Sequence, residues 1–394
     1  MEVISVGMEA GCWKPLPIFH YIPVRMYIQY YDPNIPSGEN HRPSRKKPMF
    51  KVNERLREYL NQHGRGVRLP VEYRDLQRFT YSLPLKDKEG NDTAWETVIY
   101  DLREWDYIRE GLIGIYANLK TEGDMTFSKH LDVARIDFCG FGNSQPFRIR
   151  IVNKFNDNYD HYYIKIADAS RIYGLELEHL LSPNRIKFLI SKETLVEEHI
   201  PGIPGDLFSA NYLERPDTNK IRLAKEFVKF NERCFVRLLG DMRSYNWVID
   251  ITPDIEDYQY RIRAIDFDQQ SYEGRKNLYL PQYFKENNPF VDVTLKYLNK
   301  DSIEQYQTEE RTMIAFRLAS ARYRVKELLD IMIRDTISTP EKTMQLAREL
   351  SEFHNFHPGL LRSNTMGRLV KEHLKVCLRK NLLMIPRLQG KIAD

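Results

Sequence analysis

Residues 238–250 read LLGDMRSYNWVID, and after a polar turn residues 258–270 read YQYRIRAIDFDQQ. The apolar runs in the two segments predict a pair of neighbouring strands. Asp241 and Asn246 belong to a short loop that leads into the first strand, and Asp266 follows the second strand directly. The pair would therefore present two carboxylates and an amide at one edge. Such hard oxygen ligands suit Mg²⁺ together with a triphosphate.

The two segments resemble the catalytic core of the protein-kinase-like superfamily, which includes protein kinases, aminoglycoside and choline phosphotransferases, and lipid kinases. DMRSYN is similar to the catalytic-loop pattern Asp-x-x-x-x-Asn, and IDFD is similar to the metal-binding Asp-Phe-Gly motif. Two positions depart from the family pattern: Leu239 replaces a usual His, and Asp268 replaces the glycine. Gly240 before Asp241 is closer to the His-Gly-Asp form of the small-molecule phosphotransferases.

The resemblance implies a function for each of these side chains, with ATP and Mg²⁺ as cofactors. Asp241 would orient an attacking hydroxyl and accept its proton, and Asn246 and Asp266 would hold Mg²⁺. Asp268 could bind the same ion. Arg243 stands where many Ser/Thr kinases carry a lysine, and it would neutralise the transferred phosphoryl group.

The fold implied by the resemblance is α+β and bilobal. A small antiparallel sheet lobe would span residues 129–200, and a mainly helical large lobe would span residues 201–394. An N-terminal extension of unknown role, residues 1–128, would precede them. It could form a separate small domain or pack on the small lobe.

A turn with two glycines lies between two predicted strands of the small lobe. Residues 133–138 and 147–152 have strand character, and Gly140 and Gly142 lie in the small-residue segment between them. Glycine lets a backbone approach phosphate oxygens closely, which is the function of the glycine-rich loop in the family. A plain hairpin explains the same residues, because the third glycine of the family motif is missing.

Lys165 lies in a predicted apolar strand, YYIKIA, which a helix follows. The family pairs its strand lysine with a glutamate on the next helix, so that the ammonium group faces the α and β phosphates. Glu176 and Glu178 are the available carboxylates. We favour Glu176, because Leu180 one turn later would share its buried face. Without the resemblance, a solvent-facing lysine would be the ordinary expectation.

Residues 197–206 read EEHIPGIPGD, and two Pro-Gly pairs predict a constrained connector. In the family, backbone groups of the hinge between the lobes bind adenine, which would place Glu198 and Ile200 beside the nucleotide. A simple interdomain loop is the alternative, and both interpretations predict the same location.

The remaining chain is predicted to be mainly helical. Apolar spacing predicts helices at residues 220–235, 309–336 and 369–383, and a further helix opening at Pro340. Residues 269–288 have no clear period, and they occupy the place of an activation or substrate-binding segment.

Three histidines of the C-terminal region suggest a metal site, but their spacing gives little support. His354 and His357 are three residues apart, and His373 follows later. No carboxylate or cysteine partner with metal-ligand spacing is evident in the sequence. Surface or packing histidines are therefore the favoured interpretation.

The first residues of the chain are rich in proline and aromatic side chains. Residues 33–48 form a turn-dense basic segment that we interpret as an exposed loop. Its basic cluster could contact an acidic partner, although a solvated loop is the simpler reading. The cluster comprises Arg42, Arg45, Lys46 and Lys47.

Composition limits the other classes of function. The 394 residues include 59 basic and 55 acidic residues, a net charge of +4 that gives no support to nucleic-acid binding. The four cysteines show no CxxC spacing, which favours a reducing, cytoplasmic location. No apolar run of about 18 residues predicts a membrane span.

The sequence thus predicts an ATP- and Mg²⁺-dependent phosphotransferase that acts on a hydroxyl of a protein or a small molecule. A catalytically weak pseudokinase or nucleotide-binding scaffold is the main alternative, because the usual His and Gly are replaced. Transfer of AMP instead of phosphate on the same fold is a third possibility. The acceptor is not identified by any residue of the sequence.

Overall fold

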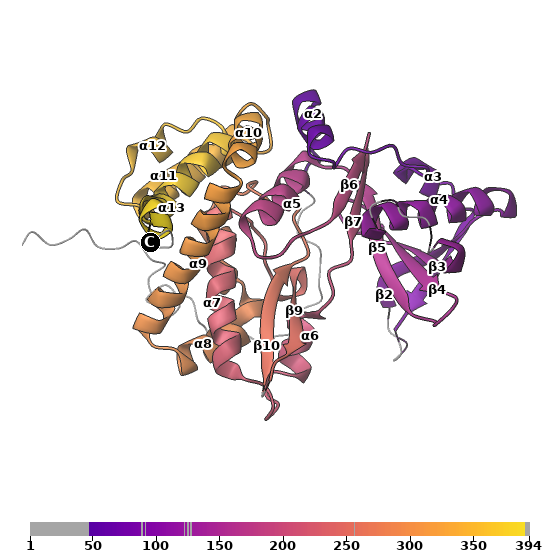
Figure 1. Ribbon diagram of the computed structural model, residues 1–394, viewed down its shortest axis with the longest axis horizontal. Helices are drawn as coiled ribbons and strands as arrows, with labels where there is room; N and C mark the ends of the chain where they lie inside the picture. The colour runs from indigo at the N-terminus through magenta and orange to yellow at the C-terminus, as the bar shows by residue number, and fades with distance from the viewer. Residues whose placement is uncertain are drawn as a thin grey trace, which may run out of the picture.

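A computed structural model describes residues 47–390, except for residues 88, 89, 91, 122, 124, 125, 127 and 256. The chain is α+β: one part is built on a seven-stranded antiparallel sheet, and the other is mostly helical (Figure 1). Two large clusters of buried apolar side chains correspond to these parts. Within the described residues, no helix combines the length and the apolar character needed to cross a membrane.

The seven-stranded sheet has the order β1-β2-β3-β4-β5-β7-β6, with antiparallel neighbours throughout. Its first hairpin, β1–β2, belongs to the segment that the sequence analysis assigned to the N-terminal extension, so that segment continues the sheet. The strands are β1 (Tyr81–Lys86), β2 (Asp92–Ile99), β3 (Leu131–Phe138), β4 (Phe147–Asn153), β5 (Tyr159–Ile166), β6 (Phe188–Ser191) and β7 (Thr194–Glu198).

Helix α4 (Leu102–Thr121) covers one face of this sheet. Ile108, Leu112 and Ile115 are fully buried on it, and they belong to the same apolar cluster as Ile149 and Ile151 of β4. Alternate residues of a strand point to the same face, so the odd-numbered positions of β4 supply the apolar contact.

Helix α5 (Ala169–Leu181) connects β5 to β6, and almost all of its residues are buried. Its N-cap is Asp168, whose side chain accepts a hydrogen bond from the Arg171 amide. Lys47 donates to the same carboxylate at 2.6 Å and is itself buried, so the prediction of an exposed basic loop is wrong at Lys47. An ammonium group this far from water requires a carboxylate partner, which the N-cap provides. Arg42, Arg45 and Lys46 lie outside the described residues.

A second, three-stranded sheet has the order β10-β9-β8. It comprises β8 (Ile203–Pro204), β9 (Trp247–Pro253) and β10 (Tyr258–Ala264). The segment that follows β7, residues 199–205, packs closely against β9 at two glycines, Gly202 and Gly205. A Cβ atom on Gly205 would lie 2.4 Å from the Trp247 ring, and Gly202 has a φ of +146°. The connector therefore has a fixed conformation that requires glycine at both positions.

The helical part lies beside these sheets, at the left of Figure 1, with α7 through its middle. Its helices are α6 (Gly205–Asn211), α7 (Lys220–Arg237), α8 (Asn288–Tyr297), α9 (Lys300–Ser320), α10 (Arg322–Ile333), α11 (Pro340–Phe353), α12 (Pro358–Leu361) and α13 (Met366–Gly390). Two further helices precede the seven-stranded sheet, α2 (Glu54–Gln62) and α3 (Tyr73–Leu76).

The predicted continuous helix over residues 309–336 is wrong, because the chain breaks at Ala321 between α9 and α10. Helix α9 packs on α7, α13 and α5, and α10 packs on α13, α5 and α2. The break lets the chain contact α7 through α9 and α2 through α10. The apolar periodicity continues across the break, so the sequence pattern alone does not reveal it.

Candidate active site

The loop that carries Asp241 is held against the segment that carries Asp266 by backbone hydrogen bonds. The Ile265 amide donates to the Asn246 carbonyl at 3.0 Å, and the Gly240 amide donates to the Gln269 carbonyl at 3.2 Å. The two segments therefore run side by side from the β9–β10 pair to the end of α7. The structure brings together the carboxylates and the amide that the sequence places at one edge.

Loop 241–246 is tightly folded around its own backbone. Asp241 has a φ of +57°, which is uncommon for a residue other than glycine, although Asp and Asn adopt it more readily than most. Asn246 Nδ2 donates to the Asp241 carbonyl at 2.7 Å, and the Asn246 amide donates to the Arg243 carbonyl at 2.8 Å. The side chain of Asn246 thus fixes the conformation that presents the Asp241 carboxylate.

The Asp241 carboxylate is partly shielded from water and lies near other acids. Arg243 Nε donates to its Oδ1 at 3.0 Å, and Arg243 Nη1 donates to Glu286 at 2.6 Å. Burial raises the pKa of Asp241 to about 6, with smaller raising effects from the charges of Asp266 and Glu286, and with Arg243 opposing them. Asp241 is therefore ionised at neutral pH, but it binds a proton far more readily than an exposed aspartate.

Arg171, in the first turn of α5, is the centre of the charged cluster. Its Nη1 donates to Oδ1 of Asp266 at 2.7 Å and to Oδ1 of Asp268 at 2.8 Å. Its Nε and Nη2 both donate to Glu197 of β7. One planar guanidinium group thus joins the sheet to the two acids that follow β10.

Lys165 does not pair with Glu176. Its ammonium group donates to Glu197 Oε2 at 2.7 Å. Sheet register explains this choice, because Lys165 pairs with Leu195 across the β5–β7 ladder and Tyr163 pairs with Glu197. Lys165 and Glu197 are therefore diagonal neighbours on one face of the sheet. Burial would raise the pKa of Glu197, but the charges of Arg171 and Lys165 lower it to about 2.

Glu176 has other partners, so its predicted contact with Lys165 is wrong. It accepts hydrogen bonds from Tyr59, Arg65 and Arg324, and it is completely buried. Glu178 is buried as well, and it pairs with Arg237. Both glutamates face inward on α5, but each neutralises an arginine from the helical part or from the segment around α2.

The turn with Gly140 and Gly142 lies at the end of β5, close to Lys165. The Ser144 carbonyl accepts a hydrogen bond from the Ile166 amide at 3.2 Å, which holds the turn against the strand. Neither glycine has a positive φ, so backbone conformation does not require glycine at either position. Phe141 between them is 64% exposed, which leaves the tip of the turn in solvent.

The predicted hinge residues lie at the end of β7. Glu198 Oε1 accepts a hydrogen bond from the Lys187 amide at 2.7 Å, so its side chain is engaged with the β6–β7 pair. Ile200 is buried in the larger apolar cluster. Glu198 is the last residue of β7 and Ile200 follows the strand, so the connector starts next to Glu197 and the charged cluster.

Burial and the charge of Asp268 raise the pKa of Asp266, and the charges of Arg171 and Lys165 oppose this effect. The side chain of Asp266 nevertheless remains 34% exposed. An acid that is held beside another acid and still faces solvent is suited to a cation from solution. The sequence analysis identified Asp266 and Asp268 but missed Arg171, Glu197 and Glu286, since only the register and the helix direction bring these three to the site.

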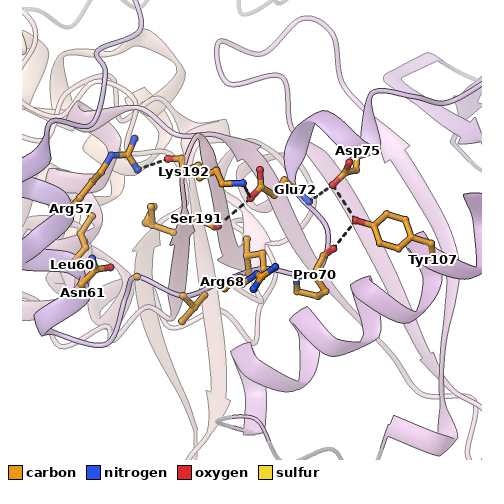
Figure 2. A pocket seen from close by; sticks show the side chains of 14 residues that line it. Arg57, Leu60, Asn61, Arg68, Pro70, Glu72, Asp75, Tyr107, Ser191 and Lys192 are labelled. Atoms are coloured by element: carbon orange, nitrogen blue, oxygen red, sulfur yellow. Dashed lines mark hydrogen bonds and ion pairs between the residues drawn. The ribbon is translucent and has the colours of Figure 1, made fainter.

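A cavity of about 900 Å³ lies elsewhere, between α2, α3, α4 and the β6–β7 turn (Figure 2). Two of its bases are engaged with the protein: Arg57 donates to the Lys192 carbonyl at 2.7 Å, and the Lys192 ammonium group pairs with Glu72 at 2.8 Å. Neither Lys165 nor Asp266 contributes to this cavity. The charged cluster around Arg171 is the better candidate for chemistry, because it holds the side chains that the sequence places at one edge.

No protein-family description matches the chain, and no curated protein is significantly similar to it.

Proposed function

We propose that this chain is an ATP- and Mg²⁺-dependent phosphotransferase that acts on a hydroxyl group, with a bilobal, protein-kinase-like arrangement of its two parts. The observation that carries the proposal is the convergence of Lys165, Asp241, Asn246 and Asp266 on one charged cluster. Phosphoryl transfer needs positioned charges around the phosphates more than covalent chemistry by the protein. The cluster supplies such charges from the large sheet, from loop 241–246 and from the segment after β10.

The side chains present are suited to a divalent cation. Both hydrogen bonds described for the Asp266 carboxylate, from Arg171 and from the Asp268 amide, are made to Oδ1. Its Oδ2 can therefore serve as a ligand. Asn246 uses its Nδ2 in the bond to Asp241, so its amide oxygen is the atom that can bind a cation. Bound Mg²⁺ would neutralise charge on the transferred phosphoryl group.

Asp241 has the properties of a general base in this proposal. It is ionised at neutral pH, and Arg243 and the Asn246 side chain fix its orientation. A carboxylate with a pKa of about 6 accepts a proton from an attacking hydroxyl better than an exposed aspartate does. Lys165 and the turn with Gly140 and Gly142 would contact the phosphates from the side of the large sheet.

A specific observation favours a second candidate, a nucleotide-binding scaffold without turnover. Arg171 Nη1 bonds both Asp266 and Asp268, so a fixed positive charge already neutralises part of the acidic pair. A divalent cation would have to bind beside this guanidinium group or displace it. In a scaffold, Arg171 would take over the stabilising function of the cation.

The experiment that tests the proposal uses the full chain with Mg²⁺ and ATP labelled on its γ phosphate and, in a parallel reaction, on its α phosphate. Metabolite and peptide pools serve as acceptors, and the mass of each labelled product is measured. We expect Mg²⁺-dependent gain of a phosphoryl group that is lost in Asp241→Asn and Asp266→Asn. Gain of an adenylyl group would indicate AMP transfer instead. Binding of ATP without any product would favour the scaffold, and the absence of both would contradict the proposal.

A further inference from the structure

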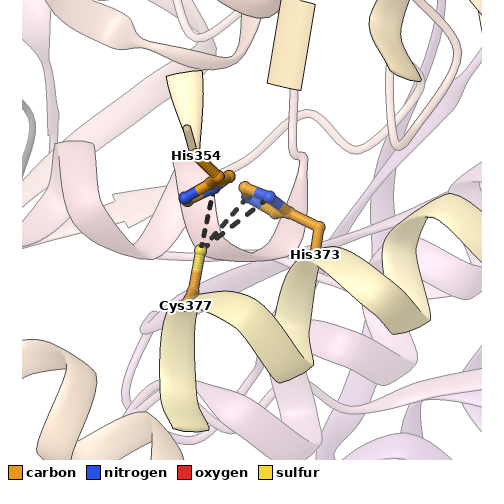
Figure 3. Close-up of side chains that lie close together, drawn as sticks. All are labelled: His354, His373 and Cys377. Atoms are coloured by element: carbon orange, nitrogen blue, oxygen red, sulfur yellow. Dashed lines mark hydrogen bonds between the residues drawn. The ribbon is translucent and has the colours of Figure 1, made fainter. Parts of the chain in front are cut away.

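Three potential metal ligands meet in the helical part, far from the cluster around Arg171 in sequence. His354 caps the C-terminus of α11, and His373 and Cys377 lie one turn apart on α13 (Figure 3). One ligand atom from each of the three residues lies within 4.8 Å of the other two. All three side chains are buried, with exposed fractions of 8%, 0% and 6%. This is the only such group of three among the described residues of the chain.

The distances match those between ligands of one metal ion. Cys377 Sγ lies 3.9 Å from His354 Nε2, and it lies 3.8 Å from Nδ1 and 3.5 Å from Nε2 of His373. With metal–nitrogen and metal–sulfur bonds of about 2.05 and 2.3 Å, sulfur and nitrogen ligands are separated by about 3.6 Å in tetrahedral and about 3.8 Å in trigonal coordination. The single thiol proton of Cys377 could form a hydrogen bond to only one of the two imidazole rings, whereas a metal ion between the rings could bind both.

The orientation of His373 is fixed by a contact that is typical of metal ligands. Its Nε2 lies 3.1 Å from the carbonyl oxygen of Phe235, on α7. With Nε2 donating to that carbonyl, Nδ1 carries the lone pair that can bind a cation. Cys377 Sγ lies over the ring, near both nitrogens, so its side chain would turn towards Nδ1 to share a cation with it. Aromatic rings enclose the group, since Phe235 packs edge-on against His373 and Phe353 packs edge-on against His354. These rings keep water away from the three ligand atoms.

The chemistry of the ligands restricts the ion. Two imidazoles and a thiolate are poor ligands for Mg²⁺ and Ca²⁺, which prefer oxygen, and good ligands for the thiophilic ions Zn²⁺ and Cu⁺. Three ligands complete a trigonal Cu⁺ site, whereas Zn²⁺ would need a fourth ligand from outside the group. Near the group, Glu232 is fully buried and has a carboxylate oxygen, Oε2, with no hydrogen-bond partner among the described residues. Its other oxygen pairs with Arg311, so the negative charge that balances a cation comes from the Cys377 thiolate.

We infer that His354, His373 and Cys377 form a binding site for one thiophilic cation, Zn²⁺ or Cu⁺, which joins α11 to α13. The site is structural, because the ligands are enclosed by packed side chains. It also contacts α7 through Phe235, and α7 ends just before Asp241. Bound metal would therefore stabilise the three helices that support loop 241–246.

The test is a titration of the full chain, first treated with a chelator, with Co²⁺ as a spectroscopic substitute under anaerobic conditions. We expect one equivalent to produce a thiolate-to-cobalt charge-transfer band, and one equivalent of Zn²⁺ or Cu⁺ to remove it. The band should disappear in Cys377→Ser and persist in Cys234→Ser, a matched control because Cys234 is also a buried free cysteine. Metal analysis of the chain purified without chelator then distinguishes zinc from copper.

A second measurement does not depend on the folding of any variant. Alkylation of the wild-type chain, followed by mass spectrometry, should show that Zn²⁺ slows modification of Cys377 at least about 10-fold and leaves the rate at Cys234 unchanged. The inference is overturned if wild-type protein shows neither a thiolate–cobalt band nor protection of Cys377. A band that survives in Cys377→Ser would also overturn it.

Discussion

Helix α5 carries two charged side chains that belong to very different clusters, Arg171 in its first turn and Glu176 near its middle. Glu176 is shared by two arginines and a tyrosine, is completely buried, and has no route to solvent. Around Arg171, by contrast, the acids outnumber the bases, and Asp266 remains 34% exposed. An enclosed network whose single acid is fully paired with arginines holds helices together, whereas an acid-rich cluster open to solvent can bind a ligand.

The difference teaches that burial and charge balance, more than spacing along a helix, distinguish a structural carboxylate from a functional one. Both clusters contain a glutamate that could have been paired with Lys165. Only the cluster with surplus negative charge has carboxylates whose pKa is raised, at Asp241 and Asp266. In the other cluster burial would raise the pKa of Glu176, but Arg65 and Arg324 hold it below the ordinary value.

The largest effect is expected from removing the charge of Asp266. Asp266→Asn should lower phosphotransfer by a factor of about 10² to 10⁴, because it removes both a cation ligand and part of the negative field of the cluster. Initial rates with saturating ATP and Mg²⁺ measure this. Asp254→Asn is the control, since Asp254 is exposed on the turn between β9 and β10. A similar loss of activity in Asp266→Asn and Asp254→Asn would contradict the assignment of Asp266 as a cation ligand.

Glu176→Gln should damage stability instead of catalysis. The substitution leaves Arg65 and Arg324 without their carboxylate, and breaking a buried ion pair costs about 3–5 kcal/mol. Urea denaturation measures the loss. Below the unfolding transition, nucleotide affinity should stay within about 3-fold of the wild type. A folded Glu176→Gln protein that fails to bind nucleotide would show that the two clusters are not separable.

Asp241→Asn should make the protein more stable while lowering turnover. The folded-state pKa of Asp241 is about 6, above its ordinary value, so folding favours the protonated form. Ionisation therefore reduces wild-type stability as the pH rises from about 4 to about 6. At pH 7 the variant should exceed the wild type by up to about 3 kcal/mol, and the advantage should vanish near pH 4. If the variant and the wild type were equally stable at pH 7 as well as at pH 4, the pKa of Asp241 would not be raised in the folded protein.

Activity should depend on the same ionisation. If Asp241 accepts the proton, kcat/KM falls below an apparent pKa of about 6, because the protonated carboxyl group cannot act as a base. Arg243→Met should raise that pKa, since Arg243 stabilises the ionised form. A profile that is flat between pH 5 and pH 8 would show that Asp241 is not the base.

The smallest effect on function is expected at Arg171, and it is measured below the unfolding transition because loss of a guanidinium group buried among three carboxylates also lowers stability. Removing its charge in Arg171→Gln frees Asp266 and Asp268, which should lower the half-saturating Mg²⁺ concentration by up to about 10-fold, or about 1.4 kcal/mol. Arg65→Gln is the matched control, because it removes a guanidinium group from the Glu176 cluster instead. An unchanged Mg²⁺ requirement in Arg171→Gln would mean that the cation does not bind at this acidic pair.

Much of the local structure could be predicted from the sequence. Apolar periodicity located β3, β4, β5, β7, β9, β10 and α7 to within a few residues, because each buries one regular face. The edge formed by loop 241–246 and Asp266 was also predicted correctly, since two strands joined by a short turn must be neighbours.

The contacts between distant segments were harder to predict. The partner of Lys165 depends on the register of β5 and β7, and a shift by one residue would move Glu197 to the other face. The expectation that no cysteine with metal-ligand spacing accompanies the histidines was wrong at Cys377, which follows His373 by one helical turn, but this spacing indicates a metal site only once α11 brings His354 to α13. Such information is tertiary, and no local pattern contains it.

The most direct test of the central claim is a calorimetric titration of ATP into the full chain, with and without Mg²⁺. We expect binding at one site that requires Mg²⁺ for full affinity, and a loss of at least about 10-fold, or about 1.4 kcal/mol, in Lys165→Met and in Asp266→Asn. The account would be contradicted if the wild-type chain did not bind ATP. It would also be contradicted if both variants bound ATP with the affinity of the wild type.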